Sequence, residues 1–173
     1  MNDVLLTARL RLEPQCAAHA DEMHAVLGDP AIYAYENDPP PSVAWLRERY
    51  ARLESRRSPD GLELWLNWVL RLHDGPAIGY VQATVHAGGR ADVAYVLASA
   101  WWGQGLATEG VHAMAAELHQ RHGVRVLHAV LKSANLRSLS LLQRMGFVSA
   151  TAEEAARAQI DADERLMVRA LAD

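Results

Sequence analysis

The chain of 173 residues is poor in the features that would place it outside the cell or across a membrane. It has a single cysteine, Cys16, which excludes an internal disulfide and gives no sign of an oxidising compartment. Its apolar runs are interrupted by Asp, Asn or Arg within about ten residues, short of the ~20 that span a bilayer. The opening residues lack the basic segment and the cleavage site of a signal peptide. We therefore expect a cytoplasmic protein that has no membrane partner.

Basic residues are also scarce. There are 17 Lys and Arg against 21 Asp and Glu, a formal net charge of −4, which argues against a general nucleic-acid binder. Hydrophobic residues make up 50% of the chain and charged residues 22%, which excludes a disordered or coiled-coil protein. No repeat or long linker divides the sequence, so residues 1–173 are predicted to form one domain.

Hydrophobic periodicity predicts a mixture of strands and helices. Alternation of apolar and polar residues predicts strands at 4–12, 62–72, 77–86, 91–98, 124–131 and 165–171. The second, third and fourth of these are joined by short glycine turns and should form an antiparallel meander. Apolar residues at helical spacing predict helices after Pro14, after Ser42, around residues 107–118 and at 135–145. The acidic segment before the last strand has no assigned structure.

The clearest chemical signal is the run from Trp101 to Thr108, which joins a strand to a helix through Gly103 and Gly105. The first N–H groups of a helix have no partner within it and carry partial positive charge, so this loop can bind a phosphate without a basic side chain. Alternatively, the glycines only permit a tight turn. A dinucleotide fingerprint would need glycine at Thr108, and the Gly-Lys-Ser/Thr of a nucleoside-triphosphate loop is missing.

A second signal is Asn135-Leu136-Arg137-Ser138, followed by Gly146-Phe147, in which Phe147 lies nine residues after Ser138. Asn135 can be explained simply as the N-cap of a short helix, with Ser138 at its third position. The order of the two signals, with a helix and a strand between them, is more informative than either one alone.

The segment ADVAYVLASAWWGQGLATEG, followed by SANLRSLSLLQRMGF, resembles the acetyl-CoA-binding half of the GNAT superfamily of N-acetyltransferases. More narrowly, it resembles the ribosomal-protein-alanine N-acetyltransferases, whose pattern Trp-Gly-x-Gly-x-Ala-Thr-Glu runs here from Trp102 to Glu109. The resemblance covers roughly residues 4–148. It implies a mixed α/β (α+β) fold, with a mostly antiparallel mixed sheet of about six to seven strands flanked by helices. A splayed pair of strands would lie at the cofactor site.

The resemblance also implies which residues contact acetyl-CoA. The backbone of Val96 and Leu97 would pair with the pantetheine arm and polarise the thioester carbonyl. The pyrophosphate would bind to the loop and helix start, at Trp102, Gly103, Gln104, Gly105, Ala107 and Thr108. Asn135 would contact the arm beside the departing sulfur. Leu142 stands where the family often has a tyrosine acid, so Ser138 is the nearest hydroxyl that can protonate or hydrogen-bond the thiolate.

Acetyl transfer to an amine needs a proton acceptor, and the resemblance assigns this role to Asp92. A solvated carboxylate at a strand end is the alternative explanation of Asp92. Glu109 and His86 are further candidates, although the first turn of a helix favours a structural carboxylate and His86 can be an ordinary surface histidine. Cys16 lies far from both motifs in the sequence, which favours direct attack of the amine in a ternary complex over an acetyl-cysteine intermediate.

The acceptor is the least defined part of the prediction. The family places it against the first helices and the loop between them, so the amine site is expected at Tyr33, Tyr35, Glu36, Asp38 and Trp45. The amine can be a small molecule or a protein N-terminus. No histidine spacing suggests a metal. Exposed strand edges and the habit of the family favour a homodimer or a weakly associating monomer. A non-catalytic acyl-CoA-binding domain stays open because of Leu142, and so does an unrelated nucleotide-binding protein.

Overall fold

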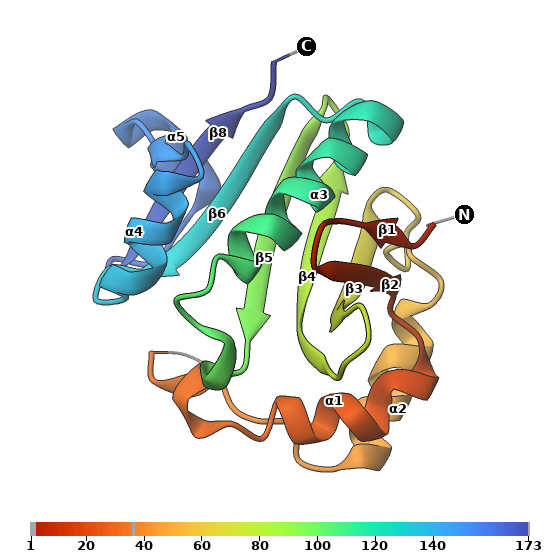
Figure 1. Ribbon diagram of the computed structural model, residues 1–173. Helices are drawn as coiled ribbons and strands as arrows, with labels where there is room; N and C mark the ends of the chain where they lie inside the picture. Colours follow the sequence, from red (N-terminus) through yellow and green to blue (C-terminus); the bar gives the residue numbers. More distant parts are fainter. Residues whose placement is uncertain (1–2, 36, 173) are drawn as a thin grey trace.

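The computed structural model describes residues 3–35 and 37–172, and its centre is one eight-stranded mixed sheet (Figure 1). The strands are β1 (Leu5–Leu6), β2 (Leu10–Pro14), β3 (Leu64–Leu72), β4 (Ala77–His86), β5 (Arg90–Leu97), β6 (Val126–Lys132), β7 (Val148–Ser149) and β8 (Glu164–Ala170). They are ordered β1-β2-β3-β4-β5-β6-β8-β7, and the pair β5 and β6 is parallel while the other described pairs are antiparallel. The predicted mixed, mostly antiparallel sheet is confirmed, with eight strands rather than six or seven.

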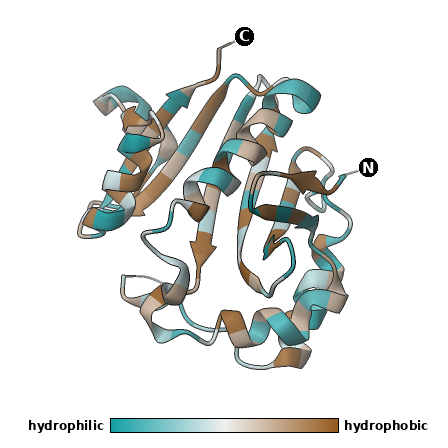
Figure 2. Ribbon diagram, viewed as in Figure 1, coloured by the Kyte–Doolittle hydropathy of each residue, from teal (hydrophilic) through white to brown (hydrophobic). Residues whose placement is uncertain are grey.

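Helices cover both faces of this sheet. The α-helices are α1 (Ala20–Val26), α2 (Val43–Leu53), α3 (Leu106–His122), α4 (Leu136–Arg144) and α5 (Ala152–Ala158), and short 3-10 turns lie at Ala17–His19, Pro30–Tyr33 and Ser99–Trp101. Figure 1 shows α3 lying across one face, with α1 and α2 grouped together near β3 and β4. Successive side chains of β3 point to opposite faces of the sheet. Trp68 and Leu70 belong to the hydrophobic cluster beneath α3, whereas Val69 belongs to the cluster beneath α1 and α2. Figure 2 shows hydrophobic residues concentrated along the strands and hydrophilic ones recurring along α3.

Three differences from the predicted elements have local physical causes. The strand predicted at 4–12 is divided into β1 and β2 by a turn, which Thr7 closes by donating from its N–H to Leu10 O at 2.9 Å. Pro14 ends β2 instead of starting a helix. The acidic segment forms α5, whose first turn is closed by a capping box between Thr151 and Glu154.

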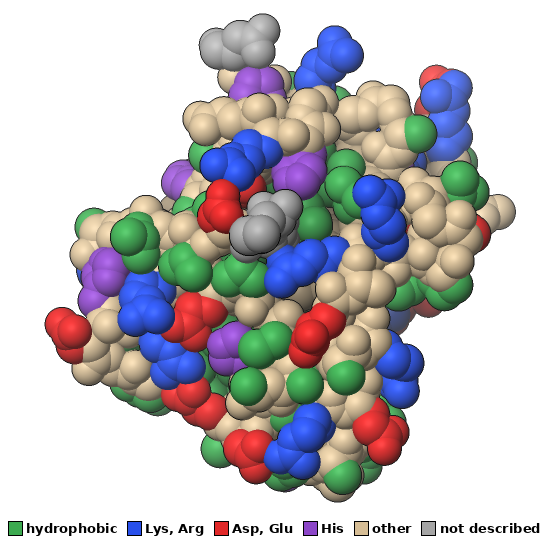
Figure 3. Space-filling view, turned by 90° about the vertical axis from the view of Figure 1, so that its right-hand side faces the viewer, with side chains coloured by type: hydrophobic (Ala, Val, Ile, Leu, Met, Phe, Trp, Pro, Cys, Tyr) green, Lys and Arg blue, Asp and Glu red, His purple; other side chains and the backbone are tan. Residues whose placement is uncertain are grey.

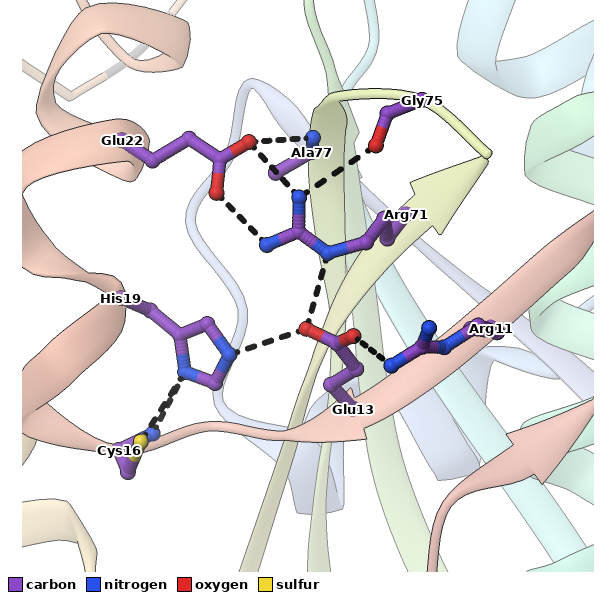
Figure 4. A network of polar contacts seen from close by, with 8 residues as sticks. All are labelled: Arg11, Glu13, Cys16, His19, Glu22, Arg71, Gly75 and Ala77. Atoms are coloured by element: carbon purple, nitrogen blue, oxygen red, sulfur yellow. Dashed lines mark hydrogen bonds and ion pairs between the residues drawn. The ribbon is translucent and has the colours of Figure 1, made fainter. Parts of the chain in front are cut away.

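A network of charged side chains fastens α1 to the sheet (Figure 4). Arg71 of β3 donates to both carboxylate oxygens of Glu22 on α1, at 2.8 and 2.6 Å, and to Oε2 of Glu13 on β2 at 3.1 Å. Glu22 also accepts from Ala77 N–H at 2.8 Å, and His19 Nε2 lies 3.1 Å from Glu13 Oε2. The hydrogen bonds from Arg71 hold the pKa of Glu22 below its ordinary value. Burial raises the pKa of Glu13, but the hydrogen bonds from Arg71 and His19 outweigh it and the net shift is downward.

The side chains on the surface do not separate by charge on the face turned to the viewer in Figure 3, where acidic and basic groups are interspersed. Among the helices of the described residues, none combines the length and the apolar character needed to cross a membrane. In the same residues there is no group of three or more His, Cys, Asp or Glu side chains placed to hold a metal ion.

The Arg71 network predicts a loss of stability in Arg71→Met. At neutral pH the free energy of unfolding should fall by about 2–4 kcal/mol, because charged hydrogen bonds are lost and two carboxylates are left facing each other. A carboxylate with a lowered pKa stabilises the folded state above its ordinary pKa of about 4.5 and loses that contribution as the pH falls. Urea unfolding at several pH values should therefore show a steeper acid loss in the wild type than in Arg71→Met.

Arg157→Met is the matched control for this measurement. Arg157 pairs with Glu153 one turn away on α5, and the two side chains are 77% and 74% exposed. Removal of such an exposed pair should cost at most about 1 kcal/mol. Equal losses in the two variants would show that the Arg71 network does not hold α1 in place.

Candidate functional site

The sheet opens between β5 and β6. The two strands are paired only at Arg90 with Val126, Ala91 with Leu127 and Asp92 with His128. Beyond Asp92 they diverge, whereas β5 stays paired with β4 as far as Leu97 (Figure 1). The splayed pair that the sequence resemblance implies is therefore present, and the pair Asp92–His128 is its apex.

Two cavities meet in this opening. The α3-side cavity has a volume of about 550 Å³ and lies between the end of β5, the start of α3 and α4. The α2-side cavity, of about 500 Å³, lies between the sheet, α2 and the loop before α2. Both cavities are lined by the same six residues at their junction, which are Ile32, Tyr35, Tyr95, Val96, Asn135 and Ser138. The two cavities therefore adjoin each other at the splay.

The start of α3 has the geometry of an anion site. Gly103 and Gly105 have φ values of 74° and 76°, a left-handed conformation that L side chains rarely adopt. Glu109 N–H makes the first bond of the helix, to Gly105 O at 3.0 Å, so the N–H groups of residues 106–108 precede the helical ladder. They lie at the α3-side cavity, whose lining includes Gly105, Ala107 and Thr108. Arg137 and Arg144 of α4 add two cationic groups to the same cavity.

The side chains of Trp102 and Gln104 have mainly structural contacts. Trp102 donates from Nε1 to Leu97 O at 2.8 Å, which ties the loop to the end of β5. Its ring lies under the guanidinium of Arg137, 3.3 Å from carbon to ring centroid, and faces the α3-side cavity. Gln104 does not line this cavity; its side chain donates to Ala100 O at 3.1 Å and its backbone O accepts from Arg9.

Glu109 joins α3 to the N-terminal strands. Its carboxylate accepts from the hydroxyl of Thr7 at 2.5 Å and from N–H and Nε of Arg9 at 2.8 and 2.7 Å. Burial raises the pKa of Glu109, but these hydrogen bonds and the charge of Arg9 outweigh it, so the carboxylate is ionised. Its contacts are those of a structural carboxylate that fixes the start of α3.

The predicted acceptor residues line the α2-side cavity, insofar as the structure describes them. Tyr33, Tyr35, Asp38 and Trp45 are in its lining, whereas Glu36 lies outside the described residues. Tyr33 donates to Leu27 O at 2.6 Å, so its hydroxyl is held by the backbone.

Sequence reasoning missed the polar floor of this cavity, which consists of Gln15, Asn67, Tyr80 and Gln82. Asn67 and Gln82 are register partners on β3 and β4. Both stand at the polar positions of alternating strands, and that alternation is the signal that could have revealed them.

Asp92 lies at the apex of the splay but outside the linings of both cavities. Its side chain is 50% exposed, and its Oδ2 is 2.7 Å from His86 Nε2. The other ring nitrogen of His86 is 3.1 Å from Glu63 Oε1, and His128 Nδ1 lies 4.0 Å from Asp92 Oδ1. Burial lowers the pKa of His128 despite the charge of Asp92. His86, predicted as an alternative base or a surface histidine, is thus bound between two carboxylates.

Ser138 and Asn135 are brought together with a residue that the sequence did not indicate, Tyr95. Asn135 is the N-cap of α4, and its Oδ1 accepts from Ser138 N–H at 3.1 Å. The Ser138 hydroxyl is 2.8 Å from the hydroxyl of Tyr95 on β5. Burial raises the pKa of Tyr95, although its bond to Ser138 acts in the opposite direction, so the phenol keeps its proton at neutral pH. The two hydroxyls join the sides of the splay at the cavity junction.

A family model for the acetyltransferase (GNAT) domain matches residues 9–148 of this chain. The chain belongs to the GNAT acetyltransferase family. Solved structures of low sequence identity share the fold of this GNAT protein. A GNAT-family acetyltransferase from Bordetella pertussis is 24% identical with a TM-score of 0.75, and the match covers 98% of this chain and 100% of that one. The search of curated proteins found no significant relative.

Ribosomal-protein acetyltransferases are among the structures with this fold. The ribosomal-protein-S5-alanine acetyltransferase from Vibrio fischeri is 14% identical with a TM-score of 0.78, and the match covers 99% of this chain and 98% of that one. RimL, an acetyltransferase of ribosomal L7/L12 solved with coenzyme A, is 15% identical with a TM-score of 0.77 and coverage of 98% for both chains. The resemblance drawn from the sequence, and with it the expectation of an N-acetyltransferase, is confirmed at the level of the family.

Proposed function

We propose that this GNAT protein transfers the acetyl group of acetyl-CoA to a primary amine by direct attack within a ternary complex. The observation that carries the proposal is the meeting of two separate cavities at the splay between β5 and β6. A reaction between two bound molecules needs this arrangement, because each ligand must have its own cavity and the reacting atoms must touch. Bound coenzyme A in RimL, which shares the fold, supports the same function.

The residues of the α3-side cavity fit coenzyme A. The N–H groups at the start of α3 suit its pyrophosphate, and the two left-handed glycines let a phosphate approach the backbone. Arg137 and Arg144 suit the remaining phosphate charge. When bound, acetyl-CoA supplies an activated acetyl group and a thiolate leaving group.

The backbone at the end of β5 provides a donor for the acetyl oxygen. Ala98 N–H bonds to Ile78 O of β4 at 2.9 Å, and N–H directions alternate along an antiparallel strand. Val96 N–H therefore faces β4, whereas Leu97 N–H faces the splay. Of the two residues assigned this role from the sequence, Leu97 is the better donor to a developing oxyanion.

Asp92 is the proposed proton acceptor for the amine. Its side chain shares a face with that of Ala94, which lines the α2-side cavity two residues further along β5, or about 7 Å away. At this spacing Asp92 takes the proton through water rather than by direct contact. His86 and Glu63 continue the chain of polar groups away from the cavity, so the proton has a route to solvent.

The first test of this proposal concerns the phosphate cradle, the loop and helix start at residues 103–108. Gly105→Val should weaken the binding of CoA by about ten- to a hundred-fold, because displacement of the backbone removes one or two hydrogen bonds to a charged group. Isothermal titration with CoA measures the effect. Gly88→Val is the matched control, since Gly88 has a similar φ of 84° in the turn between β4 and β5, away from both cavities. Unchanged affinity in folded Gly105→Val would remove the cradle from the proposal.

The second test concerns the base. Asp92→Asn should lower kcat/KM by roughly 10²- to 10⁴-fold at neutral pH, the usual span for a general base. The loss should shrink at high pH, where the free amine has already lost its proton. Release of free thiol from acetyl-CoA with a panel of amines provides the assay, and Asp74→Asn, in the exposed turn between β3 and β4, is the control.

Two results would contradict these assignments. Full activity of Asp92→Asn at neutral pH would move the base to another group. Binding of CoA without turnover of any amine would favour a non-catalytic acyl-CoA-binding domain. The buried Leu142, at the position of the family's tyrosine, fits that alternative.

A further inference from the structure

Two hydroxyl groups meet at the place where the proposed reaction breaks a bond. Tyr95 comes from β5 and Ser138 from α4, on opposite sides of the splay, and their oxygens are 2.8 Å apart. Both residues line both cavities. Leu142, which stands at the position of the family's tyrosine, is 2% exposed and brings no polar group. The protein therefore has a phenol at the junction, but from the strand rather than from the helix.

We propose that Tyr95 is a positioning residue for acetyl transfer, which donates its phenolic proton to Ser138 Oγ and so turns the Ser138 hydroxyl toward the departing sulfur. This inference rests on the proposed function. As the new carbon–nitrogen bond forms, the carbon–sulfur bond breaks and its electron pair stays on sulfur. Ser138 holds the resulting thiolate by a hydrogen bond, the amine's proton passes to Asp92 and then to solvent, and the thiolate takes a proton from solvent.

The geometry allows either hydroxyl to donate, and their relative acidity favours Tyr95 as the donor. Ser138 N–H is used by Asn135 Oδ1, which fixes the serine in the first turn of α4. A phenol is more acidic than an aliphatic hydroxyl, so Tyr95 is the better donor of the two. Burial keeps this phenol protonated. With Tyr95 donating, the single proton of the serine hydroxyl is left for the sulfur, and the bond to Tyr95 polarises it further.

The test uses the pKa of bound CoA thiol, because hydrogen bonds to a thiolate lower the pKa of its thiol. Thiolate absorbance is titrated in the CoA complex, and subtraction of the free enzyme removes the contribution of Cys16. Tyr95→Phe and Ser138→Ala should each raise the pKa of the bound thiol by about one unit, the size expected for a lost hydrogen bond to a charged group. Ser140→Ala, an exposed serine of the same helix, should leave it unchanged.

Kinetics provide an independent readout. Each of the two variants should lower kcat by about ten- to a hundred-fold and leave KM for acetyl-CoA within about two-fold. Because Tyr95 acts through Ser138, the double variant should lose no more than Ser138→Ala alone. Ser138→Thr keeps the hydroxyl and should restore most of the activity. If Tyr95→Phe does not fold, 3-fluorotyrosine at position 95 is a stronger donor of the same shape and should lower the pKa of the bound thiol.

Several outcomes would overturn the inference. An unchanged thiol pKa in folded Tyr95→Phe, or losses that multiply in the double variant, would show that Tyr95 does not act through Ser138. A rise in KM alone would indicate a packing role for Tyr95. Failure of the wild type to acetylate any amine would instead contradict the proposed function, so the two failures are distinguishable.

Discussion

The parallel pairing of β5 and β6 ends after three residues, and the rest of the site depends on this break. A sheet that continued here would have no opening, and the N–H of Leu97 would be used by a neighbouring strand. Because the pairing stops at Asp92 and His128, backbone groups of β5 face a gap instead of a strand. The same break gives Asp92 its position at the apex and places Tyr95 opposite Ser138. One local failure of strand pairing thus brings together the groups to which the proposed mechanism assigns a role in acetyl transfer.

The elements on either side of this gap are held by charged contacts that span long distances in the sequence. Glu109 binds Thr7 and Arg9 and so fixes the start of α3 against the N-terminal strands. Arg71 does the same for α1 on the opposite face, through Glu22 and Glu13. These contacts explain how a short loop with two glycines can keep its N–H groups aimed at one cavity. The walls of the two cavities belong to a single folded unit of sheet and helices.

Much of the fold could be read from the sequence because its strands and helices have regular hydrophobic periods. The meander from β3 to β5, the helix α3 and the loop around Gly103 and Gly105 are cases in which local pattern and tertiary structure agree. The divided first strand was missed because the turn is made by backbone and side-chain hydrogen bonds between Thr7 and Leu10, and no hydrophobic period reveals such bonds. The helix α5 was missed although Thr151 and Glu154 form a readable capping box. Tyr95 was missed for a different reason. Its role depends on a partner 43 residues away that only the folding of α4 brings near.

The start of α3 lines only one of the two cavities and α2 lines only the other, whereas the loop before α2 and the start of α4 contribute to both. Each cavity then has a wall that the other does not share. In the proposed reaction, the donor and the acceptor would then occupy cavities that share only the residues of their junction. Substitutions on α2 can therefore reshape the wall of the α2-side cavity without touching the start of α3. In the proposed reaction, the choice of acceptor and the binding of the acyl donor therefore depend on different helices of one fold.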